Sequence, residues 1–325
     1  MATPLDQLEA VTNDFFLIKD GKAEENYFET SFLLDYFLKQ KKGIHKRPSG
    51  GQQITIPIRY DGNASGFFTR GGTLDSTKRE AITNVNFQWK HCYGNGTILY
   101  TDELINAGPE AMINLTTEEL IGAQKSIRDT LATSLYNGLD GDTENLTGVN
   151  SMCDTTATTS YGGYASNDIV SADGTKVWTG KGSASSTTLT LNNLRVGRTA
   201  AAYGQGKQTR PDFCATTETN FDTLSNILSV QQRFTEKDSE PVKAGFQGIR
   251  FEGMDIFPDR YCPADNVYLL SSHHTGFAIH KKAMFKRTPW EKIQGSANDK
   301  TMKILFSGNF VCNNRRASYR YSNIS

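Results

Sequence analysis

Two stretches near the start of the chain alternate between apolar and polar residues, and this alternation constrains the fold more than any other feature. They are QQITIPIRY and ITNVNFQWKHCYG. Apolar side chains at every second position predict strands with one apolar face. Pro57 lies on the opposite face and has no amide proton to donate, so we expect the first strand to be an edge strand. The apolar face comprises Ile54, Ile56, Ile58 and Tyr60 on the first strand, and Val85, Phe87, Trp89, His91 and Tyr93 on the second.

The segment between these strands, DGNASGFFTRGGTLDSTK, is glycine-rich and polar, and its Phe67-Phe68 pair is expected to be exposed. The whole stretch therefore predicts a long two-stranded ribbon with a loop at its tip. A ribbon of this kind is only marginally stable alone in water. No helical segment interrupts it to cover the aromatic face. We expect that face to be covered either by the rest of the same domain or by a neighbouring copy of the chain.

Two amphipathic helices flank the ribbon. The first lies in ENYFETSFLLDYFLKQKKG, where apolar side chains recur every three or four residues and Gly43 is the expected end signal. The second is expected to span residues 109–137 as one helix of about 29 residues, with Pro109 at its first position. Alternatively, a capping box formed by Thr116 and Glu119 would start this helix later.

Residues 138–188 are rich in Gly, Ser, Thr and Asn, with isolated aromatic residues, and predict loops and short strands. From Thr190 onward helices alternate with strands. Thr190 is expected to cap a helix that ends at Gly204. Further along, RPDFCATT and NVYLLS predict short buried strands, ETNFDTLSNILSVQQRF predicts a helix, and Gly253 is expected at the centre of a hairpin. The fold class is therefore α+β.

Composition excludes several classes of protein. Lys plus Arg equals Asp plus Glu at 35 each, so the chain lacks the basic excess of a dedicated nucleic-acid binder. No apolar run approaches the length needed to span a membrane, and the first residues do not resemble a signal peptide. The five cysteines form no CxxC pair, which argues against a zinc site or a disulfide scaffold.

No catalytic pattern emerges either. His273 and His274 are adjacent, so on a strand they would point to opposite faces and could not both bind one ion. Cys262 lies in a predicted turn and has no helix N-terminus to lower its pKa. The chain has no GxSxG sequence, no P-loop and no GxGxxG that opens a helix. We therefore expect no catalytic residue, no metal and no cofactor, and a structural protein rather than an enzyme.

The order of these parts resembles the major capsid proteins of tailed bacteriophages, which share the HK-97-like fold. Four segments carry the resemblance: GGQQITIPI, TDELINAGPEAMINL, LTGVNSM followed by SYGGY, and FEGMDIFPDRYCPADNVYLL. None is a strong motif alone, and their order along residues 25–325 is the signal.

The resemblance implies a division of the chain. The expected parts are an N-terminal arm (residues 1–49), an extended β-ribbon loop lying across a neighbouring subunit (50–100), a peripheral domain with a spine helix and Gly-rich loops (101–188), an axial domain (189–270), and strands that return to the peripheral domain (271–325).

The resemblance also implies a function. Many copies would assemble through pentamers and hexamers into the icosahedral head of a tailed phage, in the cytoplasm of a bacterial host, and enclose double-stranded DNA that they touch non-specifically. The implied partner is a portal, with scaffold or decoration proteins as further candidates, and no membrane is implied. The expected subunit-interface residues are Phe28, Phe32, Tyr36, Phe37, Ile54, Ile56, Ile58, Val85, Phe87 and Trp89.

Two alternatives remain open at this point. An encapsulin-like nanocompartment shell would have the same fold and hold an enzyme cargo instead of a genome. A β-rich, glycan-binding surface protein is prompted by the polar region with Tyr161, Tyr164 and Trp178, and it would be a stable monomer. An enzyme is the third possibility and would require turnover by a soluble monomer.

Overall fold

A computed structural model describes residues 31–39, 44, 48–105, 115–186, 188–202, 210–229 and 249–324. The chain divides into two compact units. The larger is Thr30–Lys90, Leu131–Lys281 and Gly308–Ser325, and the smaller is Met1–Glu29, His91–Thr130 and Lys282–Ser307. Within the described residues, no helix combines the length and the apolar character that crossing a membrane would require.

A six-stranded sheet organises the larger unit. Its central strands, β10 and β7, are buried along their whole length, which confirms the two short buried strands predicted from NVYLLS and RPDFCATT. β7 runs parallel to β9 and antiparallel to β10. The strands follow the order β6 (Gly182–Ser183), β15 (Tyr319–Tyr321), β10 (Val267–Leu270), β7 (Phe213–Thr216), β9 (Met254–Pro258) and β8 (Ile249–Phe251).

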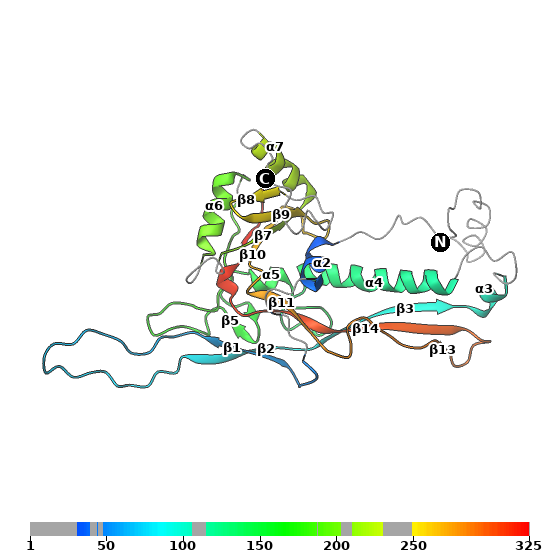
Figure 1. Ribbon diagram of the computed structural model, residues 1–325, viewed down its shortest axis with the longest axis horizontal. Helices are drawn as coiled ribbons and strands as arrows, with labels where there is room; N and C mark the ends of the chain where they lie inside the picture. The colour runs from blue at the N-terminus through cyan, green and yellow to red at the C-terminus, as the bar shows by residue number, and fades with distance from the viewer. Residues whose placement is uncertain are drawn as a thin grey trace. The chain divides into compact units, whose positions relative to one another are not determined.

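Two helices pack on one face of this sheet, α6 (Leu191–Ala200) and α7 (Glu218–Ser229), as Figure 1 shows. The predicted cap of α6 is confirmed, because the Thr190 hydroxyl oxygen accepts a hydrogen bond from the Asn193 amide at 3.2 Å. The helix ends at Ala200, and the expected end signal, Gly204, lies outside the described residues. The apolar side chains beneath both helices form one buried cluster with β7, β9 and β10.

The opposite face is covered by α2 (Phe32–Lys39) and by the C-terminal end of α4 (Leu115–Asn137). The Phe32 ring stacks on Phe257 of β9 with centroids 3.9 Å apart, and the Phe37 ring meets Phe213 of β7 at 5.5 Å. The Tyr136 ring of α4 lies 5.7 Å from Tyr268 of β10. The sheet is therefore sandwiched between helices, and α2, which we assigned to an arm, is part of the core of this unit.

The hairpin predicted around Gly253 is confirmed. β8 and β9 are antiparallel, and the turn between them has Glu252 at φ 50° and Gly253 at φ 80°, the two positive values of a tight hairpin turn. The Glu252 carboxylate pairs with Arg195 at 2.5 Å and with Arg198 at 3.5 Å, which ties the turn to α6. β9 and β10 do not pair with each other, because β7 lies between them.

The end of the chain differs from our division, which assigned residues 271–325 to return strands of the peripheral domain. Within the larger unit, β11 (Thr275–Ile279) does pair with β14 (Lys300–Cys312). However, β15 pairs with β10 in the six-stranded sheet, with Val267 opposite Tyr321. The reason is packing: Tyr321 belongs to the apolar cluster under α6 and α7. The last strand therefore belongs with the segments that we had named the axial domain.

The smaller unit contains the first part of α4 and a sheet in which β14 pairs with β3 (Lys90–Ile98), β12 (Lys286–Arg287) and β13 (Glu291–Lys292), followed after β3 by α3 (Tyr100–Ile105). α4 begins at Leu115 among the described residues and has 23 residues, whereas we expected about 29 from residue 109. Residues 106–114 lie outside the described part of the chain, so the earlier start that we favoured is not tested.

Candidate subunit interface

The predicted ribbon is present as a hairpin of β1 (Ile54–Arg59) and β2 (Ile82–Phe87), visible at the lower left of Figure 1. Ile54 pairs with Phe87, and Ile56 pairs with Val85, so the two apolar faces coincide. Within the described part of the chain this sheet has two strands, which makes β1 an edge strand as Pro57 required.

The apolar face of the hairpin is covered by the same chain. All five apolar residues of β1 and β2 on that face are buried: Ile54, Ile56, Ile58, Val85 and Phe87. Over Val85 and Phe87, the cover is the turn between β4 (Ser160–Tyr161) and β5 (Tyr164–Ala165). The Gly162 carbonyl accepts a hydrogen bond from the Asn86 amide at 3.0 Å, and the Tyr161 ring meets the Phe87 ring edge-on at 5.2 Å.

The conformation and the close packing of this covering turn favour glycine. Gly162 has φ +66°, and a Cβ atom there would lie 3.1 Å from the Phe87 ring. Two adjacent glycines between tyrosines in SYGGY were the sequence signal for this close approach, and we did not connect them to the ribbon. At the base of the hairpin, the first of the two possibilities that the sequence left open therefore holds, because the same chain buries the apolar face.

We predicted that the second strand continues unbroken to Tyr93, and this prediction is wrong. β2 ends at Phe87, and β3 begins at Lys90 with the opposite phase. Lys90 is buried and its ammonium group donates to the Asp142 carbonyl, whereas His91 and Tyr93 are exposed. The phase changes because the chain leaves β1 and takes β14 as its new partner.

Trp89 lies at this break and is half-buried. Its indole N–H donates to the Gly51 carbonyl at 2.9 Å, and its ring lies 5.6 Å from the His280 ring. Next to it, the Asn309 side-chain amide donates to the Gln88 carbonyl at 3.0 Å. These three contacts hold the point where the hairpin joins the rest of the larger unit.

The exposed apolar surface lies instead in the loop between the strands, where we expected Phe67 and Phe68. Their exposed fractions are 110% and 69%, and Leu74 is exposed as well. The last backbone hydrogen bond of the ladder joins the Tyr60 amide to the Ala81 carbonyl at 2.9 Å. Two neighbouring phenylalanines in water favour a binding partner for this tip.

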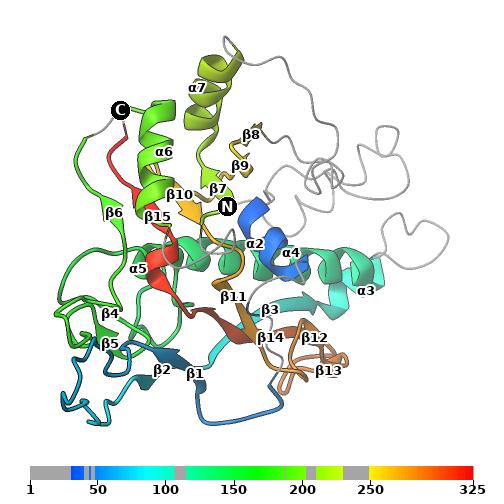
Figure 2. The ribbon, with the colours of Figure 1, turned by 60° about the vertical axis from the view of Figure 1, so that its left-hand side comes forward.

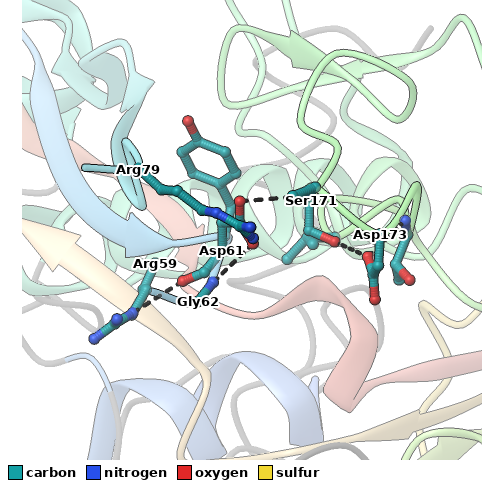
Figure 3. A pocket seen from close by; sticks show the side chains of 10 residues that line it. Arg59, Asp61, Gly62, Arg79, Ser171 and Asp173 are labelled. Carbon is teal, nitrogen blue, oxygen red and sulfur yellow. Dashed lines mark hydrogen bonds between the residues drawn. The ribbon is translucent and has the colours of Figure 1, made fainter. Parts of the chain in front are cut away.

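A polar cleft of about 620 Å³ lies at the neck of the hairpin (Figure 3). Arg59 and Arg79 line it from the hairpin, and the loop 171–177 lines it from the other side. The Asp61 carboxylate accepts from the Ala172 amide at 3.3 Å, and the Arg59 Nε–H donates to the Asp61 carbonyl at 3.0 Å. The hydrogen bond between Asp61 and Ala172 therefore holds the neck of the hairpin against the loop 171–177.

The aromatic residues that we expected at a subunit interface in the arm are mostly core residues. Phe32 and Phe37 are buried within the larger unit, and Tyr36 is half-buried. Phe28 lies outside the described residues. A subunit contact through these side chains, or through the buried face of the hairpin, stays a prediction, and their burial within one chain argues against it.

A buried carboxylate fixes the N-terminus of α2. One oxygen of Asp259 accepts from the Leu33 amide at 2.8 Å and from the Ser31 hydroxyl at 2.9 Å, and the other accepts from the Tyr261 amide at 3.0 Å. The positive end of the helix dipole favours a negative group at this place. Burial nevertheless raises the pKa of the Asp259 carboxyl, and the hydrogen bonds from Leu33, Tyr261 and Ser31 oppose that rise.

This shift predicts a pH dependence. Because the pKa of Asp259 is higher in the folded chain than in the unfolded chain, its contribution to stability is complete below the unfolded value and is lost as pH rises through the raised pKa. Asp259→Asn removes the titration. As pH rises from about 4 through the raised pKa, the unfolding midpoint of the natural protein should fall relative to that of Asp259→Asn. Midpoint curves that run parallel over this range would contradict the shift.

The cysteine and histidine side chains that could serve catalysis or metal binding have surroundings that suit a role in packing. Burial raises the pKa of the Cys153 and Cys312 thiols to about 12, so neither is a thiolate near neutral pH. Burial also raises the pKa of Cys262. The His274 Nδ1 lies 2.8 Å from the Asn313 side-chain oxygen. Among the described residues, no group of three His, Cys, Asp or Glu side chains could hold a metal ion.

Comparison with known proteins gives one kind of match. No family model matches the chain, and no curated protein matches it. Among solved structures, it is similar to the capsid asymmetric unit of the cyanophage A-1(L), with a TM-score of 0.69 and 14% identity over 94% of this chain and 96% of that chain. The capsid of a native GTA particle matches with a TM-score of 0.62 and 10% identity over 95% and 96%.

A third example is the capsid structure of the cyanophage P-SCSP1u, with a TM-score of 0.56 and 13% identity over 95% of this chain and 92% of that chain. These solved structures are shell proteins, and the likeness extends over nearly the whole of both chains. The chain therefore has the HK-97-like α+β capsid fold, which confirms the fold that the order of its sequence segments predicted.

Proposed function

We propose that this chain is the major capsid protein of a tailed bacteriophage, a structural subunit that self-assembles into an icosahedral head enclosing double-stranded DNA. The observation that supports this most is the coverage of the fold match, 94% of this chain and 96% of the A-1(L) capsid chain.

The proposal has a physical mechanism. Pentamers and hexamers of one subunit make many modest contacts, and closure of the shell links them, so that the whole is far more stable than one contact. Obligate contacts of this kind bury on the order of 2,000 Å² or more. We place one contact at the hairpin tip, where Phe67 and Phe68 are exposed and would be buried by a neighbouring subunit.

The remaining parts of the proposal follow from a role as a shell. The protein would reside in the virion after assembly in the host cytoplasm, act without catalysis, and meet a portal and any scaffold or decoration proteins. Contact with DNA would be non-specific. The equal numbers of basic and acidic residues, 35 each, suit a shell that binds the enclosed DNA only weakly through electrostatic attraction. Genome attachment that weakens steeply with salt would argue against this last point.

The test is electron microscopy of the purified protein. We expect closed shells of uniform diameter from the natural sequence, and no shells from the double variant Phe67→Ser with Phe68→Ser, whose unfolding midpoint should match that of the natural protein. Leu139→Ser is the matched control, because Leu139 is 59% exposed and lies outside the hairpin.

A natural protein that stays a monomer at high concentration would overturn the proposal. Double-variant shells equal to those of the natural protein would remove the tip from the contact and leave the rest standing. Shells isolated from the natural host with an enzyme cargo and no DNA would favour the nanocompartment.

A further inference from the structure

Arg315 is a fully buried arginine without a carboxylate among its hydrogen-bond partners in the described chain. It lies in the short helix η2 (Arg315–Ala317) after β14. Its guanidinium donates to backbone carbonyl groups and one hydroxyl: Met152 O at 2.9 Å, Trp178 O at 3.0 Å, Asp154 O at 3.0 Å, Ser151 O at 3.2 Å and Ser166 Oγ at 3.4 Å.

Two aromatic rings complete the surroundings of this charge. The guanidinium carbon lies 5.0 Å from the centroid of the Tyr161 ring and 6.0 Å from that of the Trp178 ring, within the range of cation–π attraction. A buried charge is tolerated only where polar groups replace water. Here the carbonyl dipoles and ring faces do so, and the loops that carry them are consequently arranged around one side chain.

These contacts continue to the hairpin. The Trp178 indole N–H donates to the Tyr161 carbonyl at 2.6 Å, so Arg315 and Trp178 both hold the strand β4. Tyr161 in turn packs against Phe87, and the next residue, Gly162, accepts the hydrogen bond from the Asn86 amide. An unbroken series of contacts thus runs from the guanidinium to β2, all within the larger unit.

We propose that Arg315 is a positioning residue for the β1–β2 hairpin: through Tyr161 and Gly162, it holds the hairpin in the orientation from which its tip reaches a neighbouring subunit. The part of this proposal that involves a neighbouring subunit rests on the proposed function. The anchoring of the hairpin by Arg315 is independent of that function. An arginine with only a local role would stabilise the loops that it bonds directly, residues 151–154 and 166–178, and leave the hairpin unaffected.

Hydrogen exchange of the unassembled full-length protein distinguishes the two roles. Arg315→Lys keeps the charge but replaces a planar group of five N–H donors by one ammonium, which cannot span the same carbonyls. We expect exchange at the Asn86 amide and through β2 to accelerate by about tenfold or more, as the loss of charge-assisted hydrogen bonds implies. Exchange in β7 should not change, which shows that the sheet stays folded.

Unchanged exchange in β2, together with faster exchange in residues 151–154, would overturn the proposal. Tyr161→Phe is the matched control. The Tyr161 hydroxyl is buried and has no hydrogen-bond partner among the residues that the structure describes, so this variant keeps the ring contacts and should leave exchange in β2 unchanged.

A second variant applies if Arg315→Lys does not fold. Trp178→Phe keeps Arg315 and removes the indole N–H that holds the Tyr161 carbonyl. It should also accelerate exchange in β2, and normal exchange there would equally overturn the proposal. Because all of these measurements use single subunits, they decide the role of Arg315 even if electron microscopy shows that the protein forms no shell.

Discussion

Phe37→Ala is expected to lower the free energy of unfolding of the unassembled protein by about 3–5 kcal/mol, the usual cost of removing a buried phenylalanine side chain. Phe37 is 1% exposed. Its ring meets Phe310 at 5.1 Å, Phe213 at 5.5 Å and Phe277 at 6.4 Å. The cavity would open between α2 and strands of two sheets, whose backbones are fixed by their pairing and cannot close over it.

Denaturant unfolding followed by circular dichroism measures this loss. The control is Lys39→Ala in the same helix, whose side chain is 67% exposed and pairs with Asp35 at 3.0 Å; it should cost no more than about 1 kcal/mol. The pair of variants also decides what α2 does. If Phe37→Ala unfolds like the natural protein but forms no shells, the α2 aromatics serve a subunit contact, as the sequence led us to expect, and not the core.

Local signals in the sequence predicted much of the fold. Alternation of apolar residues identified β1 and β2 and their pairing, because each strand is short and its period is set by the backbone. Thr190 identified the start of α6, since a hydroxyl before a helix can accept from a free amide. Gly253 identified the β8–β9 turn, which needs positive φ. Each of these signals lies within a few residues of its effect.

Local sequence signals could not predict which segment covers the apolar face of the β1–β2 hairpin. Gly162 follows Phe87 by 75 residues, and the contact between them depends on how a Gly-rich region folds. That region is arranged around Arg315, which is more than 130 residues further along the chain. An arginine near the end of a strand is normally exposed, and nothing in the surrounding sequence marks this one as buried.

The candidate interface shows the same limit. The sequence correctly placed apolar residues on one face of the ribbon, but the period of a strand does not say which surface covers that face. The exposed pair at the tip, Phe67 and Phe68, was visible because two aromatic residues in a glycine-rich loop have few local partners. Trp89 could not be placed, since the strand changes partner beside it when β14 replaces β1.

Alanine at Gly138 is expected to cost more than about 4 kcal/mol, which places it among the most damaging single substitutions. A Cβ atom there would lie 1.7 Å from the Leu146 carbonyl oxygen and 2.8 Å from that of Ser134. Both obstacles are backbone atoms. The Gly138 amide donates to Ser134 O, and the Gly138 carbonyl accepts from the Gly148 amide, both at 2.9 Å. No rotation of a side chain can therefore relieve the overlap.

The effect should extend beyond the end of α4. The same crossing brings Thr147 to Asn309, whose side-chain oxygen accepts from the Thr147 amide at 2.9 Å while its amide holds the Gln88 carbonyl beside the hairpin. Gly122→Ala is the control, because a Cβ at that position of α4 meets no atom of the described residues within 4 Å, and alanine should stabilise the helix by up to about 1 kcal/mol. Soluble yield and unfolding midpoint measure both variants. A Gly138→Ala protein as stable as Gly122→Ala would mean that the crossing of residues 138 and 146–148 is not as close as the structure has it.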